Sequence, residues 1–266
     1  CNVPHSNIIS APDVDSIYDV PINFEKEGLS DLLCELLSTT CGVSESKGAK
    51  DWKAFVKRVH NAKKEINIAV IGKYFETGEY ILSDAYLSVI EAIKYSAYSE
   101  NVKPVLTWIN SEKYEKDPKS IKELAKFDGI LVPGGFGKRG IDGILKAIEY
   151  ARVKKIPYFG LCYGMQVDPK TPHPVVLTMK DQVEKLKNKT YGNTMRLGDY
   201  PASLKKGTIA AKAYGATDVI ERHRHRYEVN NDYVAQLEKA GLVFSGKSPD
   251  GSLCEIAELP QSVHPF

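Results

Sequence analysis

The feature of this sequence most suited to chemistry is a cysteine between two glycines. Cys162 lies in Gly160-Leu161-Cys162-Tyr163-Gly164, directly after the apolar run that ends at Phe159. Glycines on both sides allow a sharp strand-to-helix turn, which holds the middle side chain in a strained, exposed conformation. The following backbone N–H groups would face an oxyanion, and the positive end of the next helix would favour a thiolate. The spacing predicts a cysteine nucleophile; a buried structural cysteine beside two loop glycines is the alternative.

A glycine-rich turn follows the preceding predicted strand. Leu131-Val132 continues into Pro133-Gly134-Gly135-Phe136-Gly137. Because parallel strands bring their carboxyl ends to one edge of a sheet, this turn should lie beside Cys162. A backbone N–H in the turn would then complete an oxyanion hole. A phosphate-binding loop is the rival interpretation, but the G-x-x-x-x-G-K-[ST] pattern is absent here and around Gly72-Lys73.

A third feature is the alternation of arginine and histidine between Glu221 and Asn231. On a strand, arginines 222, 224 and 226 would share one face, and histidines 223 and 225 the other. One or more of the arginines can clamp a substrate carboxylate through two hydrogen bonds. No cysteine or acid with ligand spacing accompanies the histidines, so no metal site is predicted. A structural network of ion pairs and a nucleic-acid contact are the alternatives.

The elements that must position these residues alternate between strands and helices. Strand patterns occupy 66–71, 105–109, 129–132 and 156–161, and helical patterns occupy 84–98, 121–125 and 141–153. This alternation predicts an α/β fold with a mostly parallel central sheet covered by helices on both faces. After Val175 the strands become shorter and the turns tighter, as in the pair 242–247 and 253–259. These strands predict an antiparallel extension of the sheet.

The first 64 residues differ in character from the rest. Residues 1–25 are rich in Pro, Asn, Ser and Asp and predict an extended segment with little core of its own. Helical patterns at 29–37 and 52–63 flank a Gly- and Ser-containing linker at 39–50. The compact domain is expected to begin at about residue 65. We therefore divide the chain into 1–25, a linker with short helices at 26–64, and a domain at 65–266.

Composition limits the class of protein further. Among 266 residues, 36 Lys and Arg oppose 34 Asp and Glu, and this near-balance gives no reason to expect nucleic-acid binding. No stretch approaches the about 18 apolar residues of a membrane span, and no signal segment opens the chain. Five cysteines without a C-x-x-C pair predict a reduced, cytoplasmic protein with neither a disulfide framework nor a zinc site. A first residue other than methionine, Cys1, predicts a fragment.

Taken together, these motifs resemble the glutaminase domain of CTP synthases, which is a class I, triad-type glutamine amidotransferase. The resemblance rests on four stretches: 133–137, 160–166, 193–198 and 221–231. Residues 1–4 and 13–18 resemble the last stretch of the synthetase domain in the same family. The resemblance therefore implies that 1–25 is the tail of a synthetase domain and that 65–266 is the glutaminase domain.

The resemblance also implies a role for each matching residue. Cys162 would attack the side-chain amide of L-glutamine, form a γ-glutamyl thioester and release ammonia, and water would then release glutamate. The N–H groups of Gly135 and Tyr163 would hold the oxyanion. Gln166 would contact the amino-acid end of the substrate, and Arg226 its carboxylate. The residues expected at the oxyanion and substrate site are Gly135, Phe136, Tyr163, Gly164, Gln166, Arg226 and Tyr227.

The same resemblance implies a setting for the domain. In the family, ammonia passes to a synthetase domain that uses ATP, Mg²⁺ and UTP to make CTP, and GTP activates the glutaminase step as an allosteric effector. No cofactor is expected in the glutaminase domain itself. The expected partners are L-glutamine, the synthetase domain of the same polypeptide and, for the full-length protein, the other subunits of a homotetramer. Neither nucleic acid nor a membrane is an expected partner.

Two departures from the family pattern lead to an alternative function. The family has a long helix after the nucleophile and then a glutamate that binds the substrate amine, but here Pro169 would stop a helix soon after Gln166. The family triad closes with His-Pro-Glu, whereas this chain ends in His264-Pro265-Phe266, which better matches an earlier His-Pro-Phe. We therefore do not assign His264 as the base, and expect segments to be missing after Gln166 and at the carboxyl end. A catalytically incomplete binding or regulatory module is the alternative, and a structural module for assembly is a third.

Overall fold

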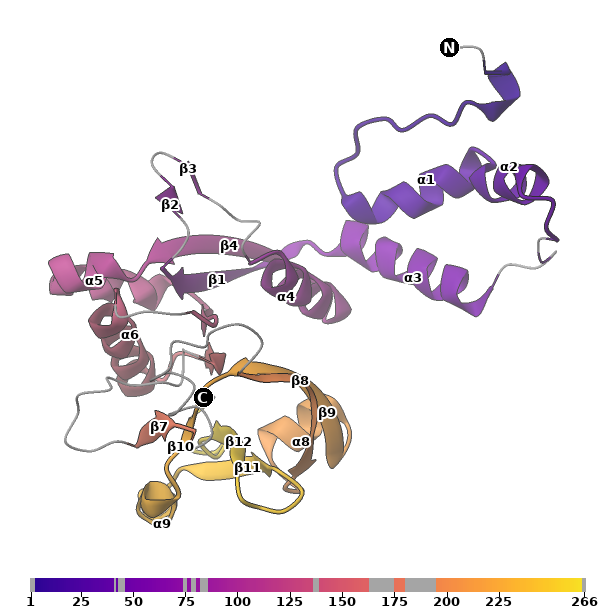
Figure 1. Cartoon of the computed structure of the whole chain (residues 1–266). Helices are drawn as coiled ribbons and strands as arrows, with labels where there is room; N and C mark the ends of the chain where they lie inside the picture. Colours follow the sequence, from indigo (N-terminus) through magenta and orange to yellow (C-terminus); the bar gives the residue numbers. More distant parts are fainter. Residues whose placement is uncertain are drawn as a thin grey trace. The chain divides into compact units, whose positions relative to one another are not determined.

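The computed structural model describes residues 3–40, 42, 46–73, 76–77, 80–81, 86–135, 139–162, 175–179 and 195–264. The chain divides into two compact units, shown in Figure 1. One unit comprises Cys1–Ile66 and Ile90–Pro104, and the other comprises Asn67–Val89 and Val105–Phe266. Within the described ranges, no helix is both long enough and apolar enough to cross a membrane.

The first unit consists of short helices around an aromatic cluster. Its helical elements are η1 (His5–Asn7), η2 (Ile17–Asp19), α1 (Val20–Lys26), α2 (Leu29–Leu36), α3 (Lys47–Asn61) and most of α4 (Leu87–Ser99). Tyr18, Phe55 and Val56 are buried, and Tyr98 packs against them. The ring of Phe55 also stacks on Tyr95, with the ring centroids 4.8 Å apart. These aromatic contacts explain why most of α4 groups with the N-terminal helices, although α4 lies between two strands of the parallel sheet in the sequence.

The predicted helices at 29–37 and 52–63 are confirmed as α2 and α3, with one difference at a boundary. Helix α3 begins at Lys47, inside the segment predicted as a linker. The cause is local, because the Ser46 hydroxyl accepts a hydrogen bond from the Ala49 N–H and caps the helix. In α2, Cys34 is disulfide-bonded, so the expectation of an entirely reduced chain is wrong at this residue. Sequence spacing does not show which thiols meet in space.

The second unit contains the predicted parallel sheet. Its strands are β1 (Lys64–Gly72), β4 (Val102–Asn110), β5 (Gly129–Val132) and β6 (Tyr158–Gly160), in the order β4-β1-β5-β6. Strand β5 is parallel to β1 on one side and to β6 on the other, where Val132 lies opposite Gly160. All four residues of β5 are buried, as expected for a central strand of a sheet covered on both faces. Beside the sheet, β2 (Glu76–Thr77) and β3 (Tyr80–Ile81) form a small antiparallel pair.

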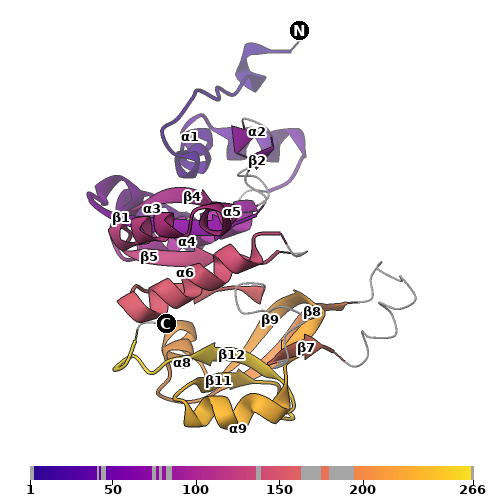
Figure 2. The same cartoon turned by 90° about the vertical axis from the view of Figure 1, so that its left-hand side faces the viewer.

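Helices flank this sheet and complete its core. They are α5 (Glu112–Lys116), the 3₁₀ helix η4 (Pro118–Lys126) and α6 (Ile141–Lys154). Figure 2 shows α6 along one face of the sheet, where Ile144, Ala147 and Ala151 are buried together with β5. The helix predicted at 141–153 is confirmed as α6, and the one predicted at 121–125 is a longer 3₁₀ helix. Helix α6 connects β5 to the parallel strand β6, so the segment after β6 begins at the same edge of the sheet as the turn after β5.

A very close approach between α6 and the start of α5 depends on glycine. A Cβ added to Gly143 would lie 1.9 Å from the carbonyl oxygen of Ser111, a fully buried residue. We expect Gly143→Ala to lower the free energy of unfolding by about 3 kcal/mol, because backbone must move to admit the methyl group. Urea unfolding measures the change. The matched control is Gly48→Ala in α3, where the nearest atom to the added Cβ is 3.8 Å away. Equal unfolding midpoints for Gly143→Ala and the wild type would contradict the close approach.

The antiparallel extension is also confirmed. Its strands are β8 (Arg196–Leu204), β9 (Asp218–His225), β11 (Val243–Lys247) and β12 (Cys254–Glu258), in the order β12-β11-β8-β9. A separate antiparallel pair joins β7 (Val176–Thr178) to β10 (Tyr227–Val229). Two helices that the sequence patterns did not predict, α8 (Ile209–Tyr214) and α9 (Asn231–Lys239), lie within this part of the chain. The two units thus contain an α/β fold with the predicted parallel and antiparallel parts.

Candidate active site

Cys162 lies at the carboxyl end of β6 with an unusual backbone conformation. Its φ is +51°, in the left-handed region, and its side chain is exposed. The N–H of Leu161 donates to the Val132 carbonyl oxygen over 2.8 Å, so the pairing between β5 and β6 continues to the residue before the cysteine. A residue with a Cβ atom loses about 1 kcal/mol or more in this conformation, and such strain concentrates at functional positions. The backbone at Cys162 therefore has the strained, exposed form that the flanking glycines predicted.

The glycine-rich turn after β5 lies against this cysteine. A Cβ built on Gly134 would be 3.5 Å from the Cβ of Cys162. The reason is topological, since β5 and β6 are parallel neighbours and their carboxyl ends lie at the same edge of the sheet. Gly135 is half-buried in this turn. The other residues expected nearby lie outside the described residues, as does the segment after Gln166: Phe136, Tyr163, Gly164 and Gln166.

His264 is buried elsewhere in the same unit. Its Nε2 atom lies 3.1 Å from the carbonyl oxygen of Ala151, near the carboxyl end of α6. Helix α6 runs from the carboxyl edge of the sheet at β5 back to the amino edge at β6, because these strands are parallel. The carboxyl end of α6 is thus at the edge opposite Cys162. This position supports leaving His264 out of the predicted triad.

The arginine–histidine strip departs from the predicted alternation at one residue. Strand β9 ends at His225 and β10 begins at Tyr227, so Arg226 lies at the break. Arg222 and Arg224 are exposed, but only 9% of Arg226 is exposed. The prediction that the three arginines share one face is therefore wrong for Arg226. The physical reason is a change of partner strand, since β9 pairs with β8 whereas β10 pairs with β7.

Backbone contacts hold this break in place. The Arg226 carbonyl oxygen accepts a hydrogen bond from the N–H of Met179, 2.9 Å away. Tyr227 lies opposite Thr178 in the register of β10 and β7, and its side chain is exposed. The Tyr227 carbonyl oxygen lies 2.8 Å from Nδ1 of His225. Arg226 and Tyr227 therefore form one ordered corner of the backbone.

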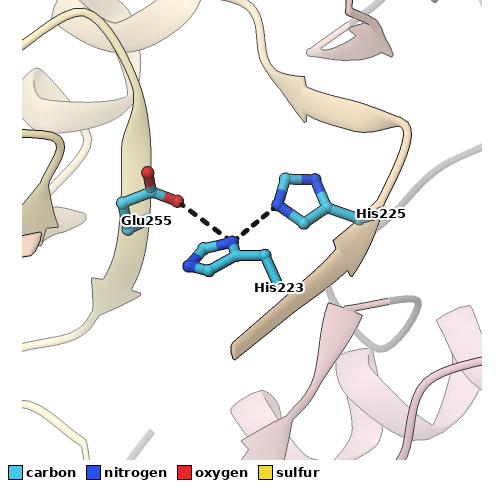
Figure 3. A group of neighbouring side chains, drawn as sticks. All are labelled: His223, His225 and Glu255. Carbon is cyan, nitrogen blue, oxygen red and sulfur yellow. Dashed lines mark hydrogen bonds and ion pairs between the residues drawn. The ribbon is translucent and has the colours of Figure 1, made fainter. Parts of the chain in front are cut away.

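His223 and His225 lie close to Glu255, a residue that is distant from them in the sequence (Figure 3). Nδ1 of His223 lies 2.7 Å from Nε2 of His225 and 3.8 Å from a carboxylate oxygen of Glu255. Three ligand-type atoms of these residues lie within 4.8 Å of one another, close enough to suit a metal ion. The prediction that no acid accompanies the histidines is therefore wrong, because Glu255 lies beside them in the folded structure. Glu255 comes from β12, and nothing in its local sequence marks it as a partner of β9.

The glutamate is already paired within the protein. Arg196 donates to both oxygens of Glu255, over 2.9 and 2.7 Å, and both side chains are more than nine-tenths buried. The Arg196 guanidinium also lies 4.2 Å from the ring centroid of Tyr200. A bidentate pair of this kind satisfies the carboxylate and balances its charge. The group therefore corresponds to the network of ion pairs that was one alternative for this strip.

Burial lowers the pKa of both histidines in this network. For His223 the nearby Arg196 guanidinium lowers the pKa further, and for His225 the bond to the Tyr227 carbonyl partly opposes the effect of burial. Both imidazoles are therefore favoured in the neutral form. A hydrogen bond from one ring nitrogen to another likewise requires that the accepting ring be neutral.

We expect stability to fall as the pH decreases below about 6.5. That is the ordinary histidine pKa in an unfolded chain, and in the folded chain the pKa of both histidines is lower, so unfolding takes up protons. The stabilisation is present above about pH 6.5 and is lost as the pH falls through the folded pKa values. Urea unfolding at pH 7.5 and 5.5 measures it. The double variant His223→Asn/His225→Asn should show a smaller difference between the two pH values, and an unchanged difference would contradict this assignment.

Comparison with known proteins places the chain in a family. Residues 81–265 match the family model described as glutamine amidotransferase class-I. CTP synthase of Rubrobacter xylanophilus is 44% identical, covering 100% of this chain and 49% of that protein. CTP synthase of Bacillus licheniformis is 40% identical, covering 100% and 51%. This chain therefore spans about half the length of these curated relatives.

A solved structure agrees with these sequence matches. The glutaminase domain of Trypanosoma brucei CTPS with bound acivicin superposes with a TM-score of 0.66 and is 34% identical. The match covers 76% of this chain and 83% of that domain. The chain therefore belongs to the class-I glutamine amidotransferases and, among them, to the glutaminase domains of CTP synthases.

Proposed function

We propose that this domain hydrolyses L-glutamine to glutamate and ammonia with Cys162 as the nucleophile. The observation that carries the proposal is the exposed thiol of Cys162, whose backbone lies in the left-handed region at the carboxyl edge of a parallel sheet. The sulfur attacks the side-chain amide carbon, and the thiol proton goes to the departing nitrogen, so ammonia leaves. The γ-glutamyl thioester that remains is cleaved by water, which restores the thiol and releases glutamate.

The turn after β5 supports an oxyanion hole in this reaction. Gly134 lies against Cys162, which supports our assignment of the N–H of the following residue, Gly135, to the negative oxygen, together with the N–H of Tyr163. Backbone N–H groups can approach a tetrahedral intermediate closely where side chains are absent. Phe136 and Gly164 are proposed to complete this part of the site.

We assign recognition of the amino-acid end of glutamine to Gln166 and to the corner at Arg226 and Tyr227. Arg226 is largely buried, and a guanidinium with little access to water binds a carboxylate strongly. The related Trypanosoma brucei domain holds acivicin, a glutamine analogue. Because the related domain binds a glutamine analogue, we take glutamine as the substrate of this domain.

For the whole protein we propose the reaction of its relatives. Ammonia from this domain would pass to a synthetase domain of the same polypeptide, which would aminate UTP to CTP with ATP and Mg²⁺, under activation by GTP. Two CTP synthases match over all of this chain and about half of their own length, which supports this proposal, and residues 1–25 would be the tail of the synthetase domain. We assign ATP, Mg²⁺ and UTP to that domain, and propose a cytoplasmic homotetramer.

Glutamine turnover by the purified protein tests the proposal. Incubation with L-glutamine should yield glutamate and ammonia in equal amounts, and acivicin should abolish both. Peptide mass analysis should then place the acivicin adduct on Cys162. A folded protein that reacts with acivicin but releases no ammonia would instead be an incomplete module with a competent thiol. A folded protein that does neither would contradict glutaminase function.

A further inference from the structure

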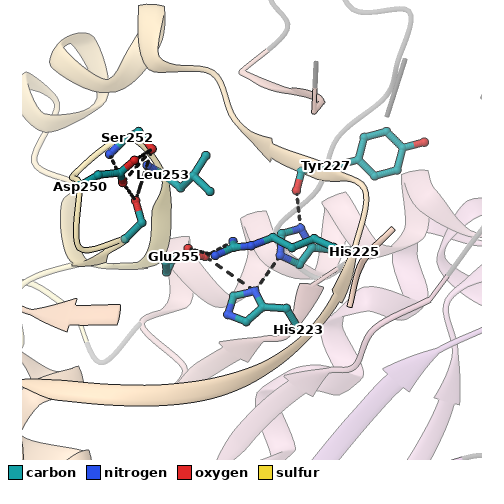
Figure 4. A network of polar contacts seen from close by, with 9 residues as sticks. His223, His225, Tyr227, Asp250, Ser252, Leu253 and Glu255 are labelled. Carbon is teal, nitrogen blue, oxygen red and sulfur yellow. Dashed lines mark hydrogen bonds and ion pairs between the residues drawn. The ribbon is translucent and has the colours of Figure 1, made fainter. Parts of the chain in front are cut away.

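We propose that His223, His225 and Glu255 are positioning residues for the substrate-carboxylate site. His223 and His225 act through two hydrogen bonds, the second of which ends on the Tyr227 backbone next to Arg226 (Figure 4), and Glu255 acts on His223 from 3.8 Å away. None of them is placed in contact with glutamine. The inference rests on the proposed role of Arg226 in binding glutamine, and the experiment below separates the two.

The carbonyl oxygen at the end of this chain of hydrogen bonds determines which ring nitrogens carry protons. The Tyr227 carbonyl oxygen can only accept, so Nδ1 of His225, 2.8 Å away, carries the proton. In a neutral ring, Nε2 of His225 is then an acceptor. It takes its hydrogen bond from the Nδ1–H of His223 over 2.7 Å. One arrangement of protons, with both rings protonated at Nδ1, therefore satisfies every bond.

The other end of the chain lies beside a buried ion pair. Nδ1 of His223 is 3.8 Å from Glu255, too far for a hydrogen bond, and Arg196 holds that carboxylate through two short hydrogen bonds. Tyr200 connects this pair to His223, since its ring lies under the Arg196 guanidinium and meets the His223 ring edge to face, with the ring centroids 5.4 Å apart. The strand register adds support, because Arg196 lies directly opposite His225 in β8 and β9. Buried, bidentate pairs of this kind resist displacement.

Hydrogen bonds hold the backbone on both sides of Arg226. The bond from His225 to Tyr227 spans that residue, and the Met179 N–H holds the Arg226 carbonyl from β7. The backbone of Arg226 is thus fixed by contacts on both sides of the break between β9 and β10. The position from which its guanidinium extends follows from these contacts. Misplacement of a substrate-binding group by about 1 Å can lower activity greatly.

A bound cation is the competing interpretation of the same three side chains. A Zn²⁺ ion would suit two imidazoles and a carboxylate. However, both carboxylate oxygens of Glu255 already accept hydrogen bonds from Arg196, whose positive charge opposes a second cation. A metal ion would also break the bond between the two rings. The observed contacts therefore favour the hydrogen-bonded chain.

Two substitutions at His225 separate the two ends of its ring. In His225→Asn the side-chain amide can replace Nδ1 and still donate to the Tyr227 carbonyl oxygen. In His225→Gln the amide replaces Nε2, so the donor to Tyr227 is lost. We expect His225→Gln to raise the KM for glutamine, and the acivicin concentration for half-maximal inactivation, by about tenfold, with kcat within about twofold. His225→Asn keeps the bond to Tyr227 but loses the bond from His223, so both values should rise less than in His225→Gln, by about threefold.

Two controls accompany these measurements on the full chain. Ile220→Val changes an exposed residue of the same strand and should leave both values unchanged. Iodoacetamide carries no carboxylate, so its rate of reaction with Cys162 should be the same in all variants. If His225→Gln does not fold, His223→Gln removes the next donor of the chain and should raise KM in the same direction.

Three results would overturn the proposal. One is an unchanged KM in His225→Gln, or in His223→Gln where it is used instead. Another is an equal loss of acivicin and iodoacetamide reactivity, which would indicate general disruption. The third is stoichiometric Zn²⁺ binding by the wild type that is lost in both His225 variants. Failure of the wild type to react with acivicin would contradict the proposed function itself, which is a separate outcome.

Discussion

Replacing Cys162 by serine should reduce glutamine hydrolysis by at least about 1,000-fold and leave stability nearly unchanged. A serine hydroxyl is far less ionised than a thiol near neutral pH, and removal of the nucleophile of a catalytic triad eliminates most of the rate enhancement. The side chain at this position is exposed, so exchanging sulfur for oxygen removes little packing. The left-handed backbone remains, since it depends on the strand and turn rather than on the sulfur atom.

The measurement is the steady rate of ammonia release, with the urea midpoint recorded for the same preparation. Cys254→Ala is the matched control. Cys254 is buried in the small core with Val229 and Phe244, and burial raises the pKa of its thiol, which keeps it protonated and unreactive. This control should lose about 1 kcal/mol of stability or more and retain full turnover per folded molecule. A Cys162→Ser protein with more than a tenth of wild-type activity would remove Cys162 from the nucleophile role.

Replacing Arg226 by methionine should raise the KM for glutamine by about 100-fold, with a smaller change in kcat. A charge-assisted, bidentate bond to a carboxylate is lost, and in a buried setting the loss of one partner of a charged pair is large. Only 9% of Arg226 is exposed, so water cannot readily take the place of the guanidinium. Methionine keeps much of the apolar stem, which limits the loss of packing.

Steady-state kinetics over a wide range of glutamine concentrations test this second expectation. Arg222→Met removes the same charge from the exposed part of β9 and should leave KM within about twofold. Iodoacetamide should still alkylate Cys162 in the Arg226 variant at the wild-type rate. If KM is unchanged in Arg226→Met, the substrate carboxylate binds elsewhere.

Local patterns in the sequence predicted the parts of the fold that depend on neighbours along the chain. The apolar run at 129–132 became β5, and the periodic segment at 141–153 became α6. Glycines around Cys162 correctly predicted a strained turn, because the sharp change of direction depends on residues within two positions of the cysteine. The turn at Gly134 could be placed beside Cys162 from topology alone, because parallel neighbours share an edge.

Such local patterns did not predict contacts between segments that are distant in the sequence. Alternation along the strip predicted a common face for its arginines, but the change from β8 to β7 as partner strand turned Arg226 inward. The start of α3 and the helices α8 and α9 depend on short capping signals such as Ser46 and Thr208. These signals predict a helix less strongly than the helix propensities of the residues along it.

The sequence by itself determined the family and the α/β class and marked Cys162 as the proposed nucleophile, because these follow from short motifs and periodicity. Only the tertiary structure joined Glu255 and Arg196 to the two histidines. Those residues come from β12 and β8, and a curved antiparallel sheet decides which of their side chains meet. Register, twist and burial are properties of paired strands, and so the surroundings of Arg226 emerge only when the strands are assembled.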